Sequence, residues 1–115
     1  TCQDAQTVAA GLRVPHAFAD YLILSIIGES DGTAIAVTDD EILQCIREVA
    51  RLEGLFLCPE GAAAVAAFEQ LAVHGYLRPD QRVVLFNTGS GLKYAALVKA
   101  EFQRLDPSNP TVFSR

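Results

Sequence analysis

Hydrophobic residues in this chain occur in short uninterrupted runs and in longer runs with helical spacing. The short runs, TAIAV at residues 33–37 and VVLF within residues 82–86, contain almost no polar interruption. Such runs are typical of strands covered on both faces, as in a parallel sheet. A two-stranded sheet is marginal on its own. We therefore expect these strands to belong to a larger α/β domain, or to one completed by a partner chain.

The first two helical runs have clear boundary residues. Residues 15–28 place apolar side chains at spacings that predict a largely buried helix, with Pro15 in its first turn. Thr38 and Glu41 form a capping box, which predicts that the next helix begins at this point. Gly54 supplies the expected C-terminal stop of that helix.

Two further helices complete the predicted order of helix, strand, helix, helix, strand, helix. Residues 61–73 are rich in alanine, which predicts a central helix closely approached by neighbouring backbone. A last helix is expected from Ser90 to about Leu105, because the following DPSNP cannot continue it. The predicted fold class is α/β, a partial parallel sheet flanked by helices, with residues 15–105 as the domain portion. Residues 1–14 are expected to lead into it as a loop, and residues 106–115 to form a tail.

Composition and charge narrow the class of protein. The 115 residues suffice for one modest domain, and half of them are hydrophobic, which is high for that size and suggests surface that packs against another part. The net charge of −5, without a basic stripe, argues against nucleic-acid binding. No apolar run approaches the length that spans a bilayer. Thr1 is not a natural initiator, so we expect the chain to be processed or part of a longer one.

The cysteines and histidines offer no metal site. Cys2, Cys45 and Cys58 are widely spaced and form no CxxC pair, which favours free thiols in a reducing cytoplasm. Cys45 lies within the amphipathic run 39–53 and is interpreted as a small buried hydrophobic residue. His16 and His74 are isolated, so each is expected at the surface or at a helix end.

The turn NTGSG at residues 87–91 is the best candidate for a small-molecule site. It lies between an expected strand and an expected helix, where ligands collect in open α/β sheets. Thr88 and Ser90 offer hydroxyl groups, and Gly89 and Gly91 allow a ligand to approach the backbone. The segment is neither a P-loop nor a complete dinucleotide fingerprint. A plain corner with Ser90 as helix cap is the alternative, and spacing alone favours it modestly.

Glu60 and Lys93 are the charged residues nearest to the expected site. Glu60 precedes the alanine-rich helix, so its carboxylate either caps that helix or faces a site, and the cap is favoured by sequence alone. Lys93 lies in the expected last helix, where a solvated lysine is the usual case. No catalytic triad or paired-carboxylate site is apparent.

Three motifs together resemble the C-terminal part of threonine synthases, members of the tryptophan-synthase-β-like, fold-type II pyridoxal-phosphate enzymes. The motifs are GLRVP (11–15), GLFLCPEGAAAVAA (54–67) and VVLFNTGSGLKY (83–94), in the family's order and spacing. The resemblance covers most of the chain from Gly11 to about Leu97. Related threonine deaminases and serine dehydratases share the architecture but match the last two motifs less well.

The resemblance implies that pyridoxal 5'-phosphate is the cofactor of the complete enzyme. Thr88 would lie beside the pyridine nitrogen, where a neutral hydroxyl leaves the ring largely unprotonated. Glu60 would lie near the ring, and Gly89 and Ser90 would continue the turn around it.

The resemblance also implies what this chain lacks. The family's Schiff-base lysine belongs to an N-terminal segment that is missing here, and Lys93 does not match it. We therefore expect no catalytic residue in this chain, which would be inactive alone and would need that N-terminal portion as its partner. The complete cytoplasmic enzyme, expected to be a homo-oligomer, would convert O-phospho-L-homoserine and water to L-threonine and phosphate. The alternatives are a non-catalytic ligand-binding or oligomerisation module and a fragment of a related dehydratase.

Overall fold

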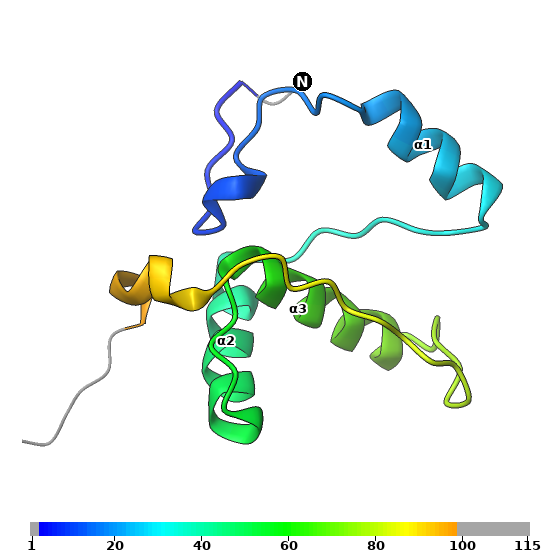
Figure 1. The fold of residues 1–115 in the computed structure, drawn as a ribbon. Coiled ribbons are helices and arrows are strands. Elements are labelled where there is room, and N and C mark those ends of the chain that lie inside the picture. Colours follow the sequence, from blue (N-terminus) through cyan, green and yellow to red (C-terminus); the bar gives the residue numbers. More distant parts are fainter. Residues whose placement is uncertain (1–2, 99–115) are drawn as a thin grey trace, which may run out of the picture.

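A computed structural model describes residues 3–98 of the chain. Its regular elements are all helical, and Figure 1 shows their order along the chain: η1 (Ala10–Leu12), α1 (Asp20–Glu29), α2 (Asp39–Glu53), α3 (Pro59–Val73) and η2 (Gly91–Leu97). None of the helices within residues 3–98 combines the length and the apolar character needed to cross a membrane.

The helix α2 forms where its boundary residues predict it. The Thr38 hydroxyl accepts a hydrogen bond from the Glu41 backbone N–H at 3.3 Å, and the Glu41 carboxylate accepts one from the Thr38 N–H at 2.7 Å. Hydrogen bonds from Thr38, first from its backbone and then from its side chain, lower the pKa of Glu41. Gly54 ends the helix with a φ of 68°, which glycine adopts without a Cβ penalty. Both boundary predictions are confirmed.

The core lies where α3 packs against α2. From α3 it takes small side chains, including Ala62, Ala63 and Ala66, and from α2 it takes Ile42, Cys45 and Ile46. Alanine allows the two helix backbones to approach closely, so the larger α2 side chains fill the space between them. The prediction of a central helix is correct only for the first half of α3, because Ala72 and Val73 near its end are exposed.

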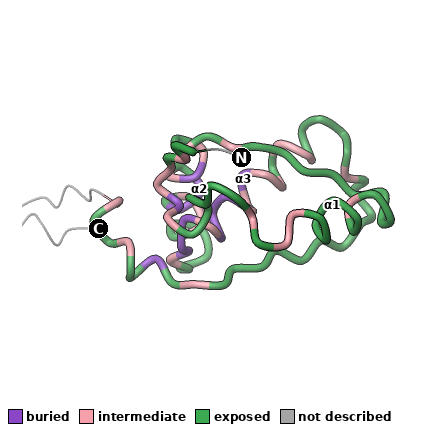
Figure 2. Tube along the Cα trace, turned by 90° about the horizontal axis from the view of Figure 1, so that it is seen from above, coloured by how far each residue is buried: buried purple, intermediate pink, exposed green. Residues whose placement is uncertain are grey.

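The prediction for residues 15–28 is wrong in two respects. The helix α1 begins at Asp20 rather than at Pro15, and it contains no buried residue. Figure 1 shows α1 away from α2 and α3, and Figure 2 shows it exposed along most of its length. Its apolar side chains therefore have no surface within residues 3–98 against which to become buried.

The expected parallel sheet is also absent from residues 3–98. Residues 33–37 and 82–86 belong to no strand, and the pairing of β type in the described chain is one antiparallel bridge between Leu57 and Ser90. The segment before Ser90 runs beside α3 in Figure 1, with Phe86 79% exposed. A strand exists only when its backbone pairs with a neighbour, and an apolar run does not contain that neighbour.

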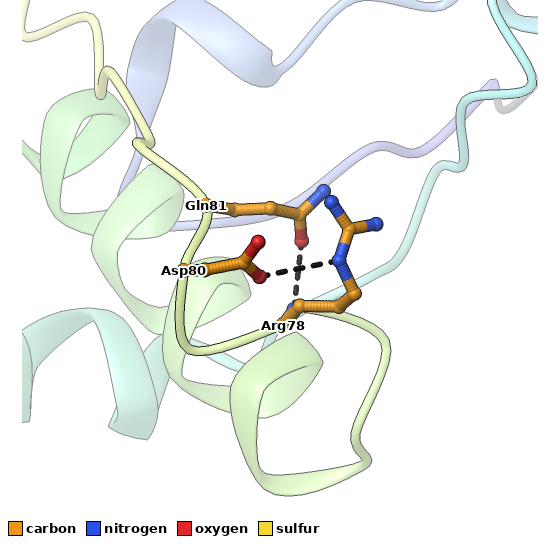
Figure 3. A network of polar contacts seen from close by, with 3 residues as sticks. All are labelled: Arg78, Asp80 and Gln81. Atoms are coloured by element: carbon orange, nitrogen blue, oxygen red, sulfur yellow. Dashed lines mark hydrogen bonds and ion pairs between the residues drawn. The ribbon is translucent and has the colours of Figure 1, made fainter.

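The turn after α3 agrees with its sequence. Gly75 has a φ of 72°. The following residues form the small polar network of Figure 3, in which the Arg78 backbone N–H donates to the Gln81 side chain at 2.7 Å and the Arg78 guanidinium contacts Asp80 at 3.2 Å. The predicted Pro79-Asp80 turn is confirmed.

The last described element differs from the expected α-helix. η2 is a 3-10 helix from Gly91 to Leu97, and Tyr94 within it has non-helical dihedrals. Ser90 caps it, as predicted, by accepting a hydrogen bond from the Leu92 N–H at 3.2 Å. The remainder of the predicted helix, 99–105, and the predicted tail, 106–115, lie outside the described residues.

Loss of the capping box should destabilise α2 measurably. Thr38→Ala removes the side-chain acceptor of an N-terminal N–H, so we expect the free energy of unfolding to fall by about 1 kcal/mol. Urea denaturation measures this change. The control is Thr33→Ala, at an exposed position outside any helix, and an equal effect of both variants would contradict the role given to the cap.

Candidate functional site

The turn at residues 87–91 lies against the N-terminus of α3, and a cavity opens between them. Its volume is about 410 Å³, within the range of about 300–1,000 Å³ that is usual for small-molecule sites. Three segments that are distant in the sequence supply its lining: Gly11 and Leu12; Cys58 and Glu60; and Thr88, Gly89, Lys93 and Tyr94. The cavity is thus a product of tertiary structure.

Glu60 connects these segments through one carboxylate oxygen. Pro59 opens α3 and Glu60 follows it in the first turn. The Gly11 backbone N–H donates to Glu60 Oε1 at 2.7 Å, and the Tyr94 hydroxyl donates to the same oxygen at 3.2 Å. The carboxylate therefore joins the 3-10 helices η1 and η2 to the N-terminus of α3.

The surroundings of Glu60 favour its ionised form. Burial is the largest single influence and raises the pKa of Glu60, but hydrogen bonds, chiefly from the Gly11 N–H and also from the Tyr94 hydroxyl, act in the opposite direction. Together they lower this pKa below its ordinary value. At neutral pH the cavity therefore has a fixed negative charge on one wall.

Cys58 is the N-cap of α3 and fixes the turn against the helix. Its Sγ accepts a hydrogen bond from the Gly61 N–H at 3.4 Å, and its thiol donates to the Asn87 side-chain oxygen at 3.4 Å. A Cβ on Gly89 would lie 3.2 Å from this sulfur, and a Cβ on Gly61 would collide with the Asn87 side chain. Small residues at 61 and 89 therefore permit the close approach that forms the cavity.

A second contact holds the far end of the turn. The Gly91 N–H donates to the Phe56 carbonyl oxygen at 2.9 Å, next to the bridge between Leu57 and Ser90. A Cβ on Gly91 would lie 2.5 Å from the Leu57 carbonyl oxygen and from a Phe56 ring carbon. Glycine at this position is thus required by packing.

The structure brings three of the four expected cofactor-binding residues together. Thr88, Gly89 and Glu60 line the same cavity, whereas Ser90 is not among its lining residues and instead caps η2. Lys93 is exposed, as expected, and also lines the cavity.

Two residues, Cys58 and Tyr94, have roles at this site that were not predicted from the sequence. Pro59 at a helix start could have pointed to Cys58 as the cap, because proline is favoured at the first helical position. Nothing in the local sequence could have indicated Tyr94, because its partner Glu60 is 34 positions away.

Other polar side chains do not extend the site. His16 and His74 are both exposed, as predicted. Cys45 is buried, as predicted, and its pKa is raised to about 11, first by burial and then by the charge of Glu69. No group of ligating side chains in the part of the chain that the structure describes could hold a metal ion.

Comparison with known proteins identifies the family to which this chain belongs. The family model described as pyridoxal-phosphate dependent enzyme matches residues 1–89, and the chain belongs to that family. The family implies pyridoxal phosphate as the cofactor of the complete enzyme.

Curated proteins that match this chain include threonine synthases, in agreement with the resemblance carried by the motifs. That of Methanosarcina acetivorans is 41% identical over 91 residues, which are 79% of this chain and 22% of the relative. That of Methanocaldococcus jannaschii is 35% identical over the same shares. That of Mycobacterium leprae is 33% identical over 88 residues, 76% of this chain and 24% of the relative. The chain thus spans about a quarter or less of the length of these relatives.

The residues that line the cavity are chemically compatible with a cofactor of this kind. The cavity has the size of a small-molecule site, and its lining includes the Thr88 hydroxyl, the Glu60 carboxylate and Gly89. These groups suit a flat, polar heterocycle that must approach the main chain closely.

Enlarging Gly91 should separate the turn from the segment before α3. In Gly91→Ala the added methyl group meets backbone and an aromatic ring, so we expect a loss of about 1–3 kcal/mol in the free energy of unfolding. Urea denaturation measures it. The matched control is Gly28→Ala in α1, where no atom lies within 4 Å of the new Cβ. Indistinguishable unfolding midpoints would contradict the packing described here.

Proposed function

We propose that this chain is the C-terminal portion of a threonine synthase, the enzyme that converts O-phospho-L-homoserine and water to L-threonine and phosphate. The observation that carries the proposal is the cavity shared by Thr88, Gly89 and Glu60, in a member of a pyridoxal-phosphate enzyme family. The names of the relatives support the choice of reaction within that family.

In this proposal the chain supplies one wall of the cofactor site. Pyridoxal phosphate, when bound, supplies the electron sink for loss of phosphate and addition of water. The Thr88 hydroxyl would lie beside the ring nitrogen and, being neutral, would leave it largely unprotonated. Gly89 would let the backbone approach the ring, Glu60 would present a negative charge near it, and Ser90 would continue the turn around it.

The chain alone is proposed to be catalytically inactive. Within residues 3–98, Lys93 is the lysine beside the cavity, and it is exposed rather than held in an apolar pocket that would favour its neutral form. The Schiff-base lysine would come from the N-terminal portion of the enzyme. We place that enzyme in the cytoplasm as a homo-oligomer.

The exposed apolar runs fit a chain that is completed by other segments. Residues 33–37 and 82–86 would become strands of a parallel sheet when strands from the rest of the enzyme pair with them, because pairing would satisfy backbone groups and cover apolar side chains. Residues 15–105 would then form the C-terminal part of the large domain, with 1–14 leading into it and 106–115 following it.

A second candidate is a non-catalytic small-ligand-binding or oligomerisation module that kept this half of the fold. The exposed apolar surface of α1, with Phe18 beside it 99% exposed, favours a role in association. One binding measurement distinguishes the two candidate functions. Tight binding of pyridoxal phosphate by the 115-residue chain alone would favour the module, and no binding would favour the enzyme portion.

The proposed reaction is tested with the full-length protein that contains this chain. We expect phosphate release from O-phospho-L-homoserine, together with the absorbance of bound cofactor. A folded full-length protein that shows neither would overturn the proposal. Ammonia release from threonine without phosphate release from the phosphorylated substrate would assign the chain to a dehydratase instead.

The Thr88 hydroxyl should matter for the cofactor more than for the fold. Thr88→Val in the full-length protein replaces the hydroxyl by a methyl group of similar size, so we expect about five- to tenfold weaker binding of pyridoxal phosphate. Fluorescence titration measures the affinity and thermal unfolding checks the fold. The control is Thr33→Val, and an unchanged cofactor affinity in Thr88→Val would exclude a hydrogen bond from this hydroxyl.

A further inference from the structure

Tyr94 differs from the other two tyrosines of the chain in the partner of its hydroxyl. Tyr76 donates to the backbone oxygen of Asp31 at 3.2 Å, and Tyr21 is 67% exposed. Tyr94 donates at 3.2 Å to Oε1 of Glu60, and both side chains line the cavity beside Thr88 and Gly89. A phenol and a carboxylate from separate elements therefore meet at the wall of the candidate site.

We propose that Tyr94 is a positioning residue, whose hydroxyl, together with the Gly11 N–H, fixes the Glu60 carboxylate at the wall of the cofactor cavity. This inference rests on the proposed function, because it assigns Tyr94 a role that acts through Glu60 on the bound cofactor. Both donors meet at the same oxygen of Glu60, at 2.7 and 3.2 Å. Two donors from different directions restrict the rotation of the carboxylate, which one donor would leave less constrained.

The backbone of η2 is consistent with this role. Tyr94 has φ −122° and ψ 23°, outside helical values, in the middle of a 3-10 helix. Its side chain is held near Glu60 although the surrounding residues, Lys93 and Ala95, are exposed. The Tyr94–Glu60 hydrogen bond is thus a link between η2 and the N-terminus of α3.

The charge environment determines the expected pH dependence. The titratable groups near the Glu60 carboxylate are the Cys58 thiol, the Tyr94 phenol and Lys93, which lines the same cavity, and the charge of Arg13 also acts on Tyr94. A hydrogen bond to the ionised carboxylate lowers the pKa of Glu60, so removing the Tyr94 hydroxyl raises it. Without the Tyr94 hydroxyl, Glu60 therefore becomes protonated at a higher pH than in the wild type when the solution is acidified.

The test compares Tyr94→Phe with Tyr76→Phe in the full-length protein. For Tyr94→Phe we expect about three- to tenfold weaker binding of pyridoxal phosphate, in line with the loss of one hydrogen bond. We also expect the acid limb of the affinity-against-pH profile to move to higher pH. Glu60→Gln, which carries no titrating carboxylate, should lack that limb. Tyr76→Phe should match the wild type in both measurements.

The outcomes separate this inference from the proposed function. If the wild-type protein binds no pyridoxal phosphate, the proposed function fails. If the wild type binds it and Tyr94→Phe has the affinity and pH profile of Tyr76→Phe, the role of Tyr94 alone is overturned.

A measurement on the apo protein keeps the inference testable if Tyr94→Phe does not fold. Burial and then the hydrogen bond and charge of Glu60 raise the pKa of Tyr94, so Glu60→Gln should lower it. NMR of an isotope-labelled Tyr94 ring carbon reports this pKa. An unchanged tyrosine pKa in Glu60→Gln would show that the two side chains do not interact, and would overturn the proposal.

Discussion

The close contact between the N-terminus of α3 and the turn at residues 87–91 is the constraint on which the candidate site depends. Cys58 caps the helix and at the same time donates to Asn87, so one side chain joins both segments. Gly61 makes this approach possible because a Cβ there would collide with Asn87, and a Cβ on Gly89 would be in tight contact with Cys58. Without that contact Thr88 and Glu60 would have no common cavity.

The packing of α3 against α2 fixes the position of the α3 N-terminus that makes this contact. The small side chains of the first half of α3 let it lie close to α2, and Ile42 and Ile46 are almost completely buried there. The N-terminal loop is fixed to the same pair of helices, since the Val8 N–H donates to Asp39 at 3.1 Å and Ala9 is fully buried. Gly11 can therefore reach Glu60 from a position that α2 determines.

Local chemistry explains which features could be predicted from sequence. The capping box of Thr38 and Glu41, the left-handed Gly54 and the cap at Ser90 depend on neighbouring residues alone, and the structure has each of them. The strands at 33–37 and 82–86 and the burial of α1 depend on partners elsewhere, and within residues 3–98 those partners do not exist. Apolar runs indicate that a segment is suited to burial, but the surface that buries it has to be supplied by another segment.

At the candidate site, too, some features could be predicted from the local sequence and others depend on residues that are distant in the sequence. Thr88, Gly89 and Glu60 could be named from the sequence, and they line one cavity, whereas Ser90 serves only as a cap among the described contacts. The hydrogen bond from Tyr94 could not be foreseen, because it requires η2 to return to the start of α3. Interactions between residues that are distant in sequence therefore determine the most specific feature of the site.

A crystal structure of the full-length protein with pyridoxal phosphate would test most directly whether this chain forms one wall of the cofactor site. We expect the Thr88 hydroxyl within hydrogen-bond distance of the pyridine nitrogen, and Glu60 in the same cavity with its link to Tyr94 retained. A cofactor bound elsewhere, with neither Thr88 nor Glu60 in contact with it, would contradict the role assigned to this chain.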